Sequence, residues 1–380
     1  MRQLPVLFIA FAAATLPTAK AAPGDVMFEE TSHQAAFKAV TIAEGLSFPW
    51  GLDFLPDGGL IVTEWTGAVR IVRDGEVSAP LTGGPVLFNH PNGRRLGMLD
   101  VALHPDHADN QLVYLCYHHG TYDSNVSRVA RARLDGDQLR DVEVILDGDN
   151  RSNETAHAGC RLVWDKEGRL IVTAGDRRHL PDESQNLSNL TGSIVNLNDD
   201  GSIPADNPFV RDDNARPEIW AYGVRNVQGA ARHPETGALW FSEHGPLGGD
   251  EVNILRRGAN YGWPIATYGI DYDGMVITED AQLSDVDGPL VYWRPSTAPS
   301  GLAFYTGDDF PDWQGDLFMG SLGDRRLIRM ELDGERVLFQ EHLLEDLDER
   351  IRTVKMGLDG YLYVMTDAEP GVILRLEPAQ

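Results

Sequence analysis

Two short segments place residues of catalytic type directly before apolar stretches of the chain. His157 comes four residues before the run that starts at Arg161, so it belongs to a loop that enters a strand. Histidine titrates near neutral pH and could act there as a general base, although a polar turn also explains the position. Arg225 and Asn226 lie between glycines in the sequence YGVRNVQG. This pair suits binding of carbonyl or carboxylate oxygens, and an arginine packed under a turn is the alternative.

A third segment, EHGPLGGDE from Glu243 to Glu251, sets four Gly or Pro residues among three acids and a histidine. Glycine and proline there would expose main-chain carbonyls, which together with carboxylates are the oxygen ligands that calcium prefers. Zinc is a poorer match because no second His or Cys lies at zinc-ligand spacing. The segment therefore predicts a calcium site, with an ordinary acidic turn as the alternative.

Near the C-terminus, Arg350 and Arg352 alternate along an apolar stretch. Alternation places both guanidinium groups on one face of a strand, where they would suit a polyanionic small molecule. Pairing with the acidic residues at 346–349 is the alternative. The chain has no GxGxxG, P-loop, HExxH or GxSxG motif, which disfavours nucleotide-dependent and hydrolytic functions.

The elements that must position these residues recur along the chain as apolar strands joined by Asp-Gly turns or their relatives. Strands such as those at 60–63 and 361–364 are rich in β-branched and aromatic residues, and no stretch keeps a helical period over three turns. The pattern predicts an all-β, six-bladed β-propeller with four-stranded antiparallel blades and long inserted loops at about 176–220 and 257–298. Its six copies begin at Gly51, Leu99, Arg161, Gln228, Ser300 and Arg352.

The charge balance and the first residues indicate where such a chain works. With 32 Lys+Arg against 58 Asp+Glu, the formal charge of -26 disfavours nucleic acid as a partner. Residues 1–21 resemble a secretory signal peptide, with Arg2 before an apolar run and small residues at its end. We therefore expect residues 22–380 to form a single exported propeller domain, periplasmic or secreted.

No other segment is apolar enough to span a membrane, so we expect no stable membrane insertion. No long apolar segment is expected to be exposed, and a monomer is the default expectation. In an oxidising compartment Cys116 and Cys160 could pair, and free buried thiols are the alternative.

Taken together, these segments resemble the soluble quinoprotein sugar dehydrogenases of the glucose/sorbosone dehydrogenase family, in particular its bacterial aldose sugar dehydrogenase branch. The likeness covers nearly the whole chain after residue 21. It rests most firmly on RNVQG followed by EHGPLGGDE and NYGWP, with PWGLDFLPDG, HAGCRL, APSGLAFYTGD and RIRTV in support.

The resemblance implies oxidation of an aldose sugar at its C1 hydroxyl to the lactone, by hydride transfer to calcium-bound pyrroloquinoline quinone. Electrons would then pass to an acceptor other than oxygen. By the same resemblance, His157 is the general base and Arg225 with Asn226 stabilises charge on the cofactor. The further expected contacts are Tyr272, Arg350 and Arg352 for the cofactor, the carbonyls of Gly245 and Pro246 for its calcium, and Glu251 with the Tyr261 carbonyl for a structural calcium.

The chain departs from the family pattern at two expected cofactor contacts. Arg95 stands where the family has a glutamine, and Gly323 stands where many members have lysine after a small residue and leucine, here Ser321 and Leu322. Arg95 could supply the positive charge lost at position 323, which is a hypothesis. The losses motivate one alternative function, a non-catalytic ligand-binding propeller of the same family. A calcium-dependent lactonase is another alternative, although it leaves the arginines without a role.

Overall fold

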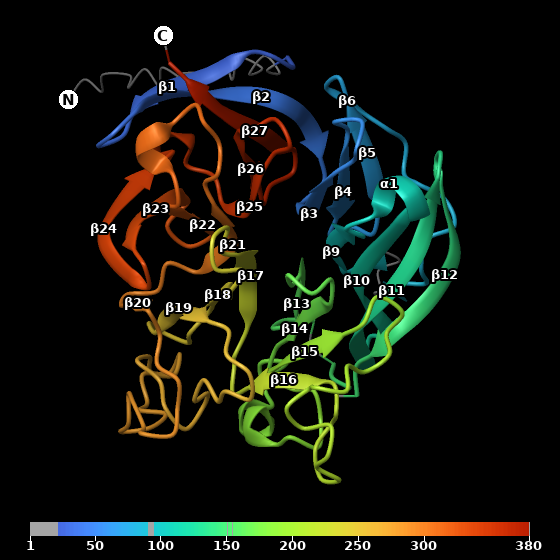
Figure 1. The fold of residues 1–380 in the computed structure, drawn as a ribbon, viewed down its shortest axis with the longest axis vertical. Coiled ribbons are helices and arrows are strands. Elements are labelled where there is room, and N and C mark those ends of the chain that lie inside the picture. The colour runs from blue at the N-terminus through green and yellow to red at the C-terminus, as the bar shows by residue number, and fades with distance from the viewer. Residues whose placement is uncertain (1–21, 90–94, 150, 154, 380) are drawn as a thin grey trace, which may run out of the picture.

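The computed structural model describes residues 22–89, 95–149, 151–153 and 155–379. The predicted signal peptide therefore lies outside the described residues. Across the described ranges, the strands form six antiparallel sheets around a central axis and one small hairpin (Figure 1). This arrangement confirms the six-bladed propeller that the repeat predicted.

Five blades each contain four strands, taken in chain order from the axis outward. The first two comprise β3 (Pro49–Phe54), β4 (Leu60–Glu64), β5 (Val69–Arg73) and β6 (Glu76–Val77), then β9 (Met98–Leu103), β10 (Leu112–Thr121), β11 (Ser124–Asp135) and β12 (Gln138–Asp147). The third and fourth comprise β13 (Gly159–Trp164), β14 (Leu170–Ala174), β15 (Ser193–Leu197) and β16 (Ile219–Tyr222), then β17 (Val227–Arg232), β18 (Leu239–Glu243), β19 (Asp250–Ile254) and β20 (Val291–Trp293). The fifth comprises β21 (Pro299–Phe304), β22 (Leu317–Ser321), β23 (Arg326–Asp333) and β24 (Arg336–Leu343).

The sixth blade joins the two ends of the described chain. From the axis outward it contains β25 (Ile351–Met356), β26 (Leu362–Thr366), β27 (Gly371–Pro378), β2 (Ala36–Leu46) and β1 (Val26–Thr31). The long blue strand β2 pairs antiparallel with the red strand β27 in Figure 1. A strand from the N-terminal region thus completes the last blade, so the ring is closed by backbone hydrogen bonds.

The remaining elements are short. They are the hairpin strands β7 (Phe88–Asn89) and β8 (Arg95–Leu96), the helix α1 (His107–Asn110), and the 3₁₀ turns η1 (Pro181–Gln185), η2 (Pro311–Trp313) and η3 (Glu345–Leu347). Across the described ranges, no helix is long and apolar enough to cross a membrane.

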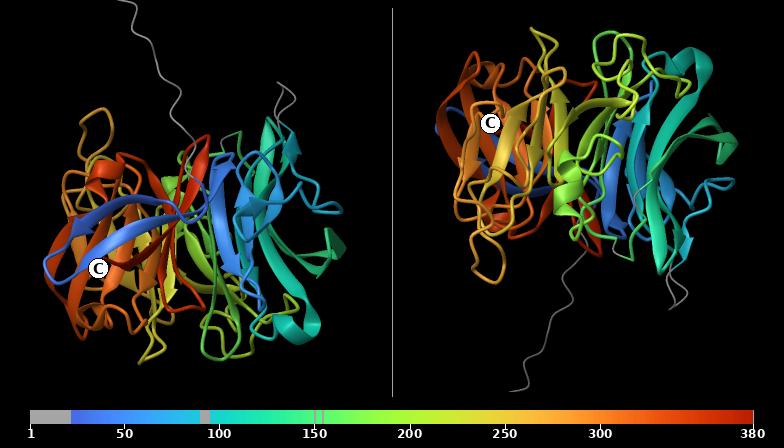
Figure 2. Two further views of the ribbon diagram at one scale, coloured as in Figure 1. Left: turned by 90° about the horizontal axis from the view of Figure 1, so that it is seen from above. Right: turned by 90° about the horizontal axis from the view of Figure 1, so that it is seen from below.

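The innermost strands form a closed ring and share one direction along the axis. Each of β3, β9, β13, β17, β21 and β25 contacts the next, and β25 contacts β3. The carboxyl ends of all six line one cavity, so their amino ends meet at the opposite end of the axis. Figure 2 shows the ring edge on, with the strands running across its thickness. His157, Arg225 and Arg350 precede β13, β17 and β25, which brings them to the same face.

Apolar side chains pack between neighbouring blades and hold the ring together. Strands β4, β22 and β26 are buried along their whole length because blades cover both of their faces. Cys116 of β10 and Cys160 of β13 form a disulfide within the cluster between the second and third blades. The structure therefore decides between the two alternatives for these cysteines in favour of pairing.

The two loops predicted at 176–220 and 257–298 are wrong in extent, because each contains a blade strand. Strand β15 was not predicted because it contains Ser193 and Asn196, which are polar although both are fully buried. The amide nitrogen of Asn196 donates to Oδ1 of Asn207 at 3.1 Å, which gives this donor a partner inside the blade. Strand β20 escaped because it spans three residues only.

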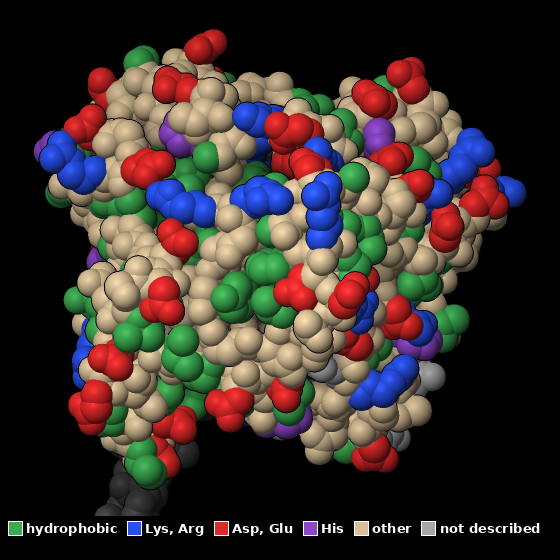
Figure 3. All heavy atoms as spheres, turned by 60° about the horizontal axis from the view of Figure 1, so that its bottom comes forward, with side chains coloured by type: hydrophobic (Ala, Val, Ile, Leu, Met, Phe, Trp, Pro, Cys, Tyr) green, Lys and Arg blue, Asp and Glu red, His purple; other side chains and the backbone are tan. Residues whose placement is uncertain are grey.

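The excess of acidic residues is not spread as one continuous field. On the face shown in Figure 3, acidic and basic side chains alternate over short distances. Paired surface groups such as Arg128 with Asp147 and Arg131 with Glu143 contribute to this pattern. The net charge still opposes binding of a polyanionic surface.

Candidate active site

His157 is held in place by a carboxylate from the neighbouring strand. Its Nδ1 lies 2.6 Å from Oδ1 of Asp176, and both side chains are largely buried. The contact follows from antiparallel pairing, since Gly159 of β13 lies opposite Ala174 of β14. His157 precedes the first strand by two residues and Asp176 follows the second by two. The left-handed backbone at His157, with φ of 48°, turns its side chain out of the strand direction.

Asp176 is a candidate functional residue that the sequence analysis missed. Its Oδ2 accepts a hydrogen bond from Nε1 of Trp263 at 2.9 Å, and its Oδ1 accepts one from the main-chain N–H of Arg178 at 2.8 Å. These donors hold the carboxylate in place, and as a hydrogen-bond acceptor it favours the Nδ1–H tautomer of the histidine. The antiparallel register could have identified Asp176, because it places a residue after β14 beside a residue before β13.

Arg225 lies beside this pair and under two aromatic rings. The main-chain N–H of Asp176 donates to the Arg225 carbonyl at 2.9 Å. The guanidinium lies 5.2 Å from the ring centroid of Trp263 and 5.8 Å from that of Tyr272. Its Nη2 is 3.4 Å from the Tyr272 hydroxyl, while its Nε is buried without a hydrogen-bond partner among the described residues. A buried donor without a partner marks this arginine as available to a ligand.

A cavity of about 710 Å³ lies against Arg225 and collects three of the predicted contacts. Arg225, Tyr272 and Pro246 line it, together with Arg178, which the sequence analysis did not single out. Tyr272 is 59% exposed, so its ring forms part of the outer wall. Two guanidinium groups and aromatic walls suit a planar anionic ligand.

Arg350 and Arg352 share one carboxylate, which confirms that they lie on one face of the chain. Nε of Arg350 and Nη2 of Arg352 approach Oδ2 of Asp367 at 3.1 and 2.9 Å. The alternative pairing with acids at 346–349 is wrong, because Asp367 follows the neighbouring strand β26. Arg350 also donates to the carbonyl of Leu322 at 2.9 Å.

Asn226 connects these groups to the axis. Its carboxamide oxygen accepts from the Gly159 main-chain N–H at 3.2 Å and from Gln228 at 3.1 Å. Gln228 in turn accepts from Nη1 of Arg352 at 3.0 Å. The predicted residues of three different blades therefore form one hydrogen-bonded group at the amino ends of the inner strands.

The carbonyl groups predicted to bind calcium already have partners. Nη1 of Arg225 donates to the Gly245 carbonyl at 2.5 Å, and the Ser296 hydroxyl donates to the Pro246 carbonyl at 3.2 Å. Asp250 fixes this loop, since its carboxylate accepts main-chain N–H groups of Gly245 and of residues 297 and 298. A cation at the Gly245 carbonyl would require Arg225 to turn away from it, because the two positive charges would repel each other.

The predicted structural calcium ligands share a smaller cavity of about 220 Å³, lined by Glu251 and Tyr261. Burial raises the pKa of Glu251 to about 7, and it also raises that of the neighbouring Glu243. The Asn253 carboxamide lies between them, 3.4 Å from Glu243 and 3.1 Å from Glu251. Among the described residues, no group of three or more His, Cys, Asp or Glu side chains is placed to hold a metal. Calcium at either place would therefore depend on main-chain oxygens.

Four further predicted contacts lie at positions 95 and 321–323. Ser321 is fully buried and donates to the Thr297 carbonyl at 2.6 Å, so its side chain stabilises a turn. A Cβ atom at Gly323 would lie 2.7 Å from the same carbonyl oxygen, which leaves no room for a side chain. Leu322 is buried and contributes its carbonyl to Arg350. The side chain of Arg95 lies outside the described part of the structure.

Burial controls the charge of the two histidines near the axis. It lowers the pKa of His157, with Arg225 adding to the effect and Asp176 opposing it, so the imidazole is neutral at pH 7. Burial also lowers the pKa of His244 to about 3. His244 donates through Nε2 to the Pro299 carbonyl at 2.7 Å, which excludes that nitrogen from metal binding in this arrangement.

Comparison with known proteins identifies the family of the chain. The model of the family described as Glucose / Sorbosone dehydrogenase matches residues 46–375. The chain belongs to this family. Aldose sugar dehydrogenase YliI of Escherichia coli is 41% identical over 351 residues, which cover 90% of this chain and 94% of that protein.

Solved structures extend the likeness to three dimensions. The soluble aldose sugar dehydrogenase of Escherichia coli, in its apo-form, superimposes with a TM-score of 0.85 at 39% identity, covering 90% of this chain and 100% of that one. The PQQ-bound form of aldose sugar dehydrogenase from Streptomyces coelicolor superimposes with a TM-score of 0.73 at 27% identity, covering 89% and 96%. The predicted family resemblance, and with it membership of a family of sugar dehydrogenases, is confirmed.

Proposed function

We propose that this protein oxidises aldose sugars at the C1 hydroxyl to the lactone, using pyrroloquinoline quinone, and passes the electrons to an acceptor other than oxygen. The observation that carries the proposal is the 2.6 Å contact between His157 and Asp176, beside Arg225 and its cavity. Family membership and the quinone-bound relative support the choice of cofactor.

The residues of the candidate site fit that cofactor, with Arg350 and Arg352 lying outside the lining of the cavity beside Arg225. When bound, pyrroloquinoline quinone supplies a quinone that accepts two electrons as hydride. Arg225 has a buried Nε–H without a partner among the described residues, and it would donate to a quinone oxygen. Arg350 and Arg352 would bind carboxylate groups once they exchange Asp367 for the ligand. Tyr272 would pack its ring against the planar molecule.

His157 performs the proton transfer in this proposal. With Nδ1–H directed at Asp176, its Nε2 carries the lone pair that accepts the proton of the C1 hydroxyl. The neutral state that burial imposes is the state a base needs. Asp176 stabilises the imidazolium that forms, without taking the proton itself.

We propose that the carbonyls of Gly245 and Pro246 bind calcium. It would polarise the cofactor and would offset the charge of its carboxylates. Because Arg225 occupies the Gly245 carbonyl, we expect metal and cofactor to bind together, with Arg225 exchanging that carbonyl for the cofactor. The residues Glu251 and Tyr261 are proposed as a second, structural calcium site.

We also propose that the protein works as an exported, periplasmic or secreted enzyme. A buried disulfide between Cys116 and Cys160 supports this, since such bonds persist in oxidising compartments.

Reconstitution tests the proposal directly. Apo-protein receives calcium and pyrroloquinoline quinone, and reduction of a dye is followed with a panel of aldoses. We expect turnover that requires both additions and is abolished by His157→Ala, with cofactor binding retained in the variant. Absence of dye reduction with every sugar, together with no spectral change on adding the cofactor, would favour a non-catalytic binding protein. Lactone hydrolysis with calcium alone would favour a lactonase.

A further inference from the structure

A second cavity lies at the opposite end of the propeller axis from the candidate active site. Its volume is about 780 Å³, within the range of small-molecule sites, and the carboxyl ends of all six inner strands line it. None of its lining residues belongs to the cavity beside Arg225. The proposed dehydrogenase activity gives this cavity no role.

Arg161 lines the far cavity and is buried. Its Nε donates to the Gln228 carbonyl at 2.5 Å and its Nη2 donates to the Arg352 carbonyl at 3.0 Å. Its guanidinium lies 4.1 Å from the ring centroid of Trp50, and Asp100 approaches it at 3.3 Å. The far cavity therefore has a built polar floor and is a site of its own.

The charge of this cavity differs from that of the whole chain. Its lining includes one more cationic side chain than carboxylates, although the chain carries a formal charge of -26. The chain has four lysines in all, and two of them, Lys166 and Lys355, are among these residues. A concave site with low-dielectric walls concentrates such a charge and attracts anions.

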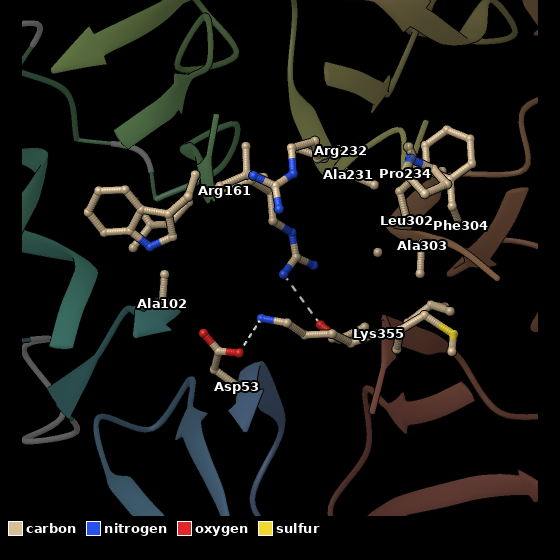
Figure 4. A pocket seen from close by; sticks show the side chains of 18 of the residues that line it. Asp53, Ala102, Arg161, Ala231, Arg232, Pro234, Leu302, Ala303, Phe304 and Lys355 are labelled. Carbon is tan, nitrogen blue, oxygen red and sulfur yellow. Dashed lines mark hydrogen bonds and ion pairs between the residues drawn. The ribbon is translucent and has the colours of Figure 1, made fainter. Parts of the chain in front are cut away.

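Lys355 is the cation best placed to bind an anion. Its Nζ lies 2.7 Å from Oδ1 of Asp53. That carboxylate also accepts the main-chain N–H groups of Phe54 at 2.9 Å and Leu103 at 2.7 Å, so it remains hydrogen-bonded when the lysine turns away. Arg232 also points into the cavity and, among the described residues, has a carbonyl but no carboxylate as its partner (Figure 4).

The opposite wall is apolar. Leu302, Ala303 and Phe304 of β21 face the charged groups across the cavity (Figure 4), and Val354 and Met356 extend this surface. A ligand that combines a negative group with an apolar body would complement both sides of the cavity.

We propose that this far cavity binds a small organic carboxylate with an apolar body, whose carboxylate displaces Asp53 from Lys355.

Benzoate is a suitable probe, with benzyl alcohol as the neutral and benzylamine as the cationic analogue. Calorimetric titration of the full-length protein is expected to show binding of benzoate and not of the other two. Lys355→Met should weaken it at least about tenfold, the effect of losing a charged hydrogen bond. Asp53→Asn should tighten it, because the competing carboxylate is gone.

Lys38→Met provides the matched control. Lys38 also pairs with a carboxylate, that of Glu377 at 3.3 Å, but it lies on β2 outside the cavity, so benzoate binding should be unchanged. If Lys355→Met fails to fold, Arg232→Gln at the cavity rim must weaken binding several-fold instead. Absence of benzoate binding, binding that ignores the Lys355 and Arg232 changes, or preferential binding of benzylamine would each overturn the proposal.

Discussion

The described residues bind one nitrogen of the His157 imidazole and leave the other nitrogen without a hydrogen-bond partner. Asp176 binds Nδ1, and Trp263 with the Arg178 main chain holds Asp176 in turn. Every contact on this path fixes an orientation, and none of them uses the nitrogen that would face a sugar. In the proposed reaction, the orientation of the base is therefore fixed by the fold before the sugar binds.

Replacing Asp176 with Asn tests this arrangement. A carboxamide can present its N–H to the histidine and favour the wrong tautomer, so we expect kcat to fall by roughly 10²- to 10⁴-fold while KM changes little. Steady-state kinetics of the reconstituted enzyme give both constants. Asp182→Asn, an acid at the cavity wall with no contact to His157, serves as the control. A variant in which KM changes while kcat stays the same would contradict the role of Asp176.

The pH profile reports the charge of His157. Because burial lowers its pKa below the usual 6.5, the neutral base persists to lower pH than in a free histidine. We expect the acid limb of kcat/KM, where His157 becomes protonated, to be centred below pH 6.5. An acid limb centred above pH 6.5 would contradict this prediction.

Position 323 gives a prediction opposite to the one its family pattern suggests. A lysine there would place Cβ 2.7 Å from the Thr297 carbonyl, so Gly323→Lys should destabilise the protein by about 1–3 kcal/mol. We expect no gain in quinone affinity, because the backbone must move first. Thermal unfolding and cofactor titration measure the two effects. Gly84→Lys, where a Cβ would meet only Leu139 at 3.5 Å, should be nearly neutral.

At the scale of elements, single carboxylates connect loops that belong to different strands. Asp250 begins β19 and binds main-chain N–H groups on both the loop before it and the loop that leads into β21. Asp367 follows β26 and binds two arginines before and within β25. Loops without regular structure are thus positioned as firmly as strands, which the chemistry of the site requires.

The disulfide connects the second and third blades close to His157. Cys160 lies three residues after His157, and its partner Cys116 lies in β10. Replacing both with Ser should lower the free energy of unfolding by about 2–4 kcal/mol. Urea unfolding of the double variant measures this, with reduced wild-type protein expected to match it. Equal midpoints for the oxidised wild type and the variant would show that the bond contributes nothing.

The sequence predicted those elements whose signal is local. Blade strands with β-branched residues and Asp-Gly turns were identifiable, and so were His157, Arg225 and Arg350, because each directly precedes a strand. Asp176 and Asp367 were missed, since an isolated aspartate after a strand has no pattern of its own. The contact of Arg225 with Gly245 was also missed, because it depends on how two loops fold over each other.

For the whole molecule, the ring depends on the pairing of β2 with β27. Phe37 on β2 is fully buried and packs edge-on against Trp313 of the fifth blade, with ring centroids 5.7 Å apart. No local pattern identifies this pairing, because its two strands lie at opposite ends of the chain. It is nevertheless the contact that makes six sheets one closed structure.

Phe37→Ala should therefore destabilise the entire protein. Loss of a buried aromatic side chain costs about 3–5 kcal/mol. Leu338→Ala on β24, where the side chain is 52% exposed, is the control and should cost little. Chemical denaturation followed by circular dichroism measures both. A cost for Phe37→Ala as small as that for Leu338→Ala would show that β2 contributes little to closure.

The pairing of β2 with β27 also determines when a newly synthesised chain can finish folding. β27 follows the strands of the first five blades along the chain, so β2 has no partner until those blades have been synthesised. Until then the first blade has no neighbour on one side, and its apolar face stays open to other proteins. Because one blade combines the first and the last described strands, the ring cannot close until the strands of all six blades have been made.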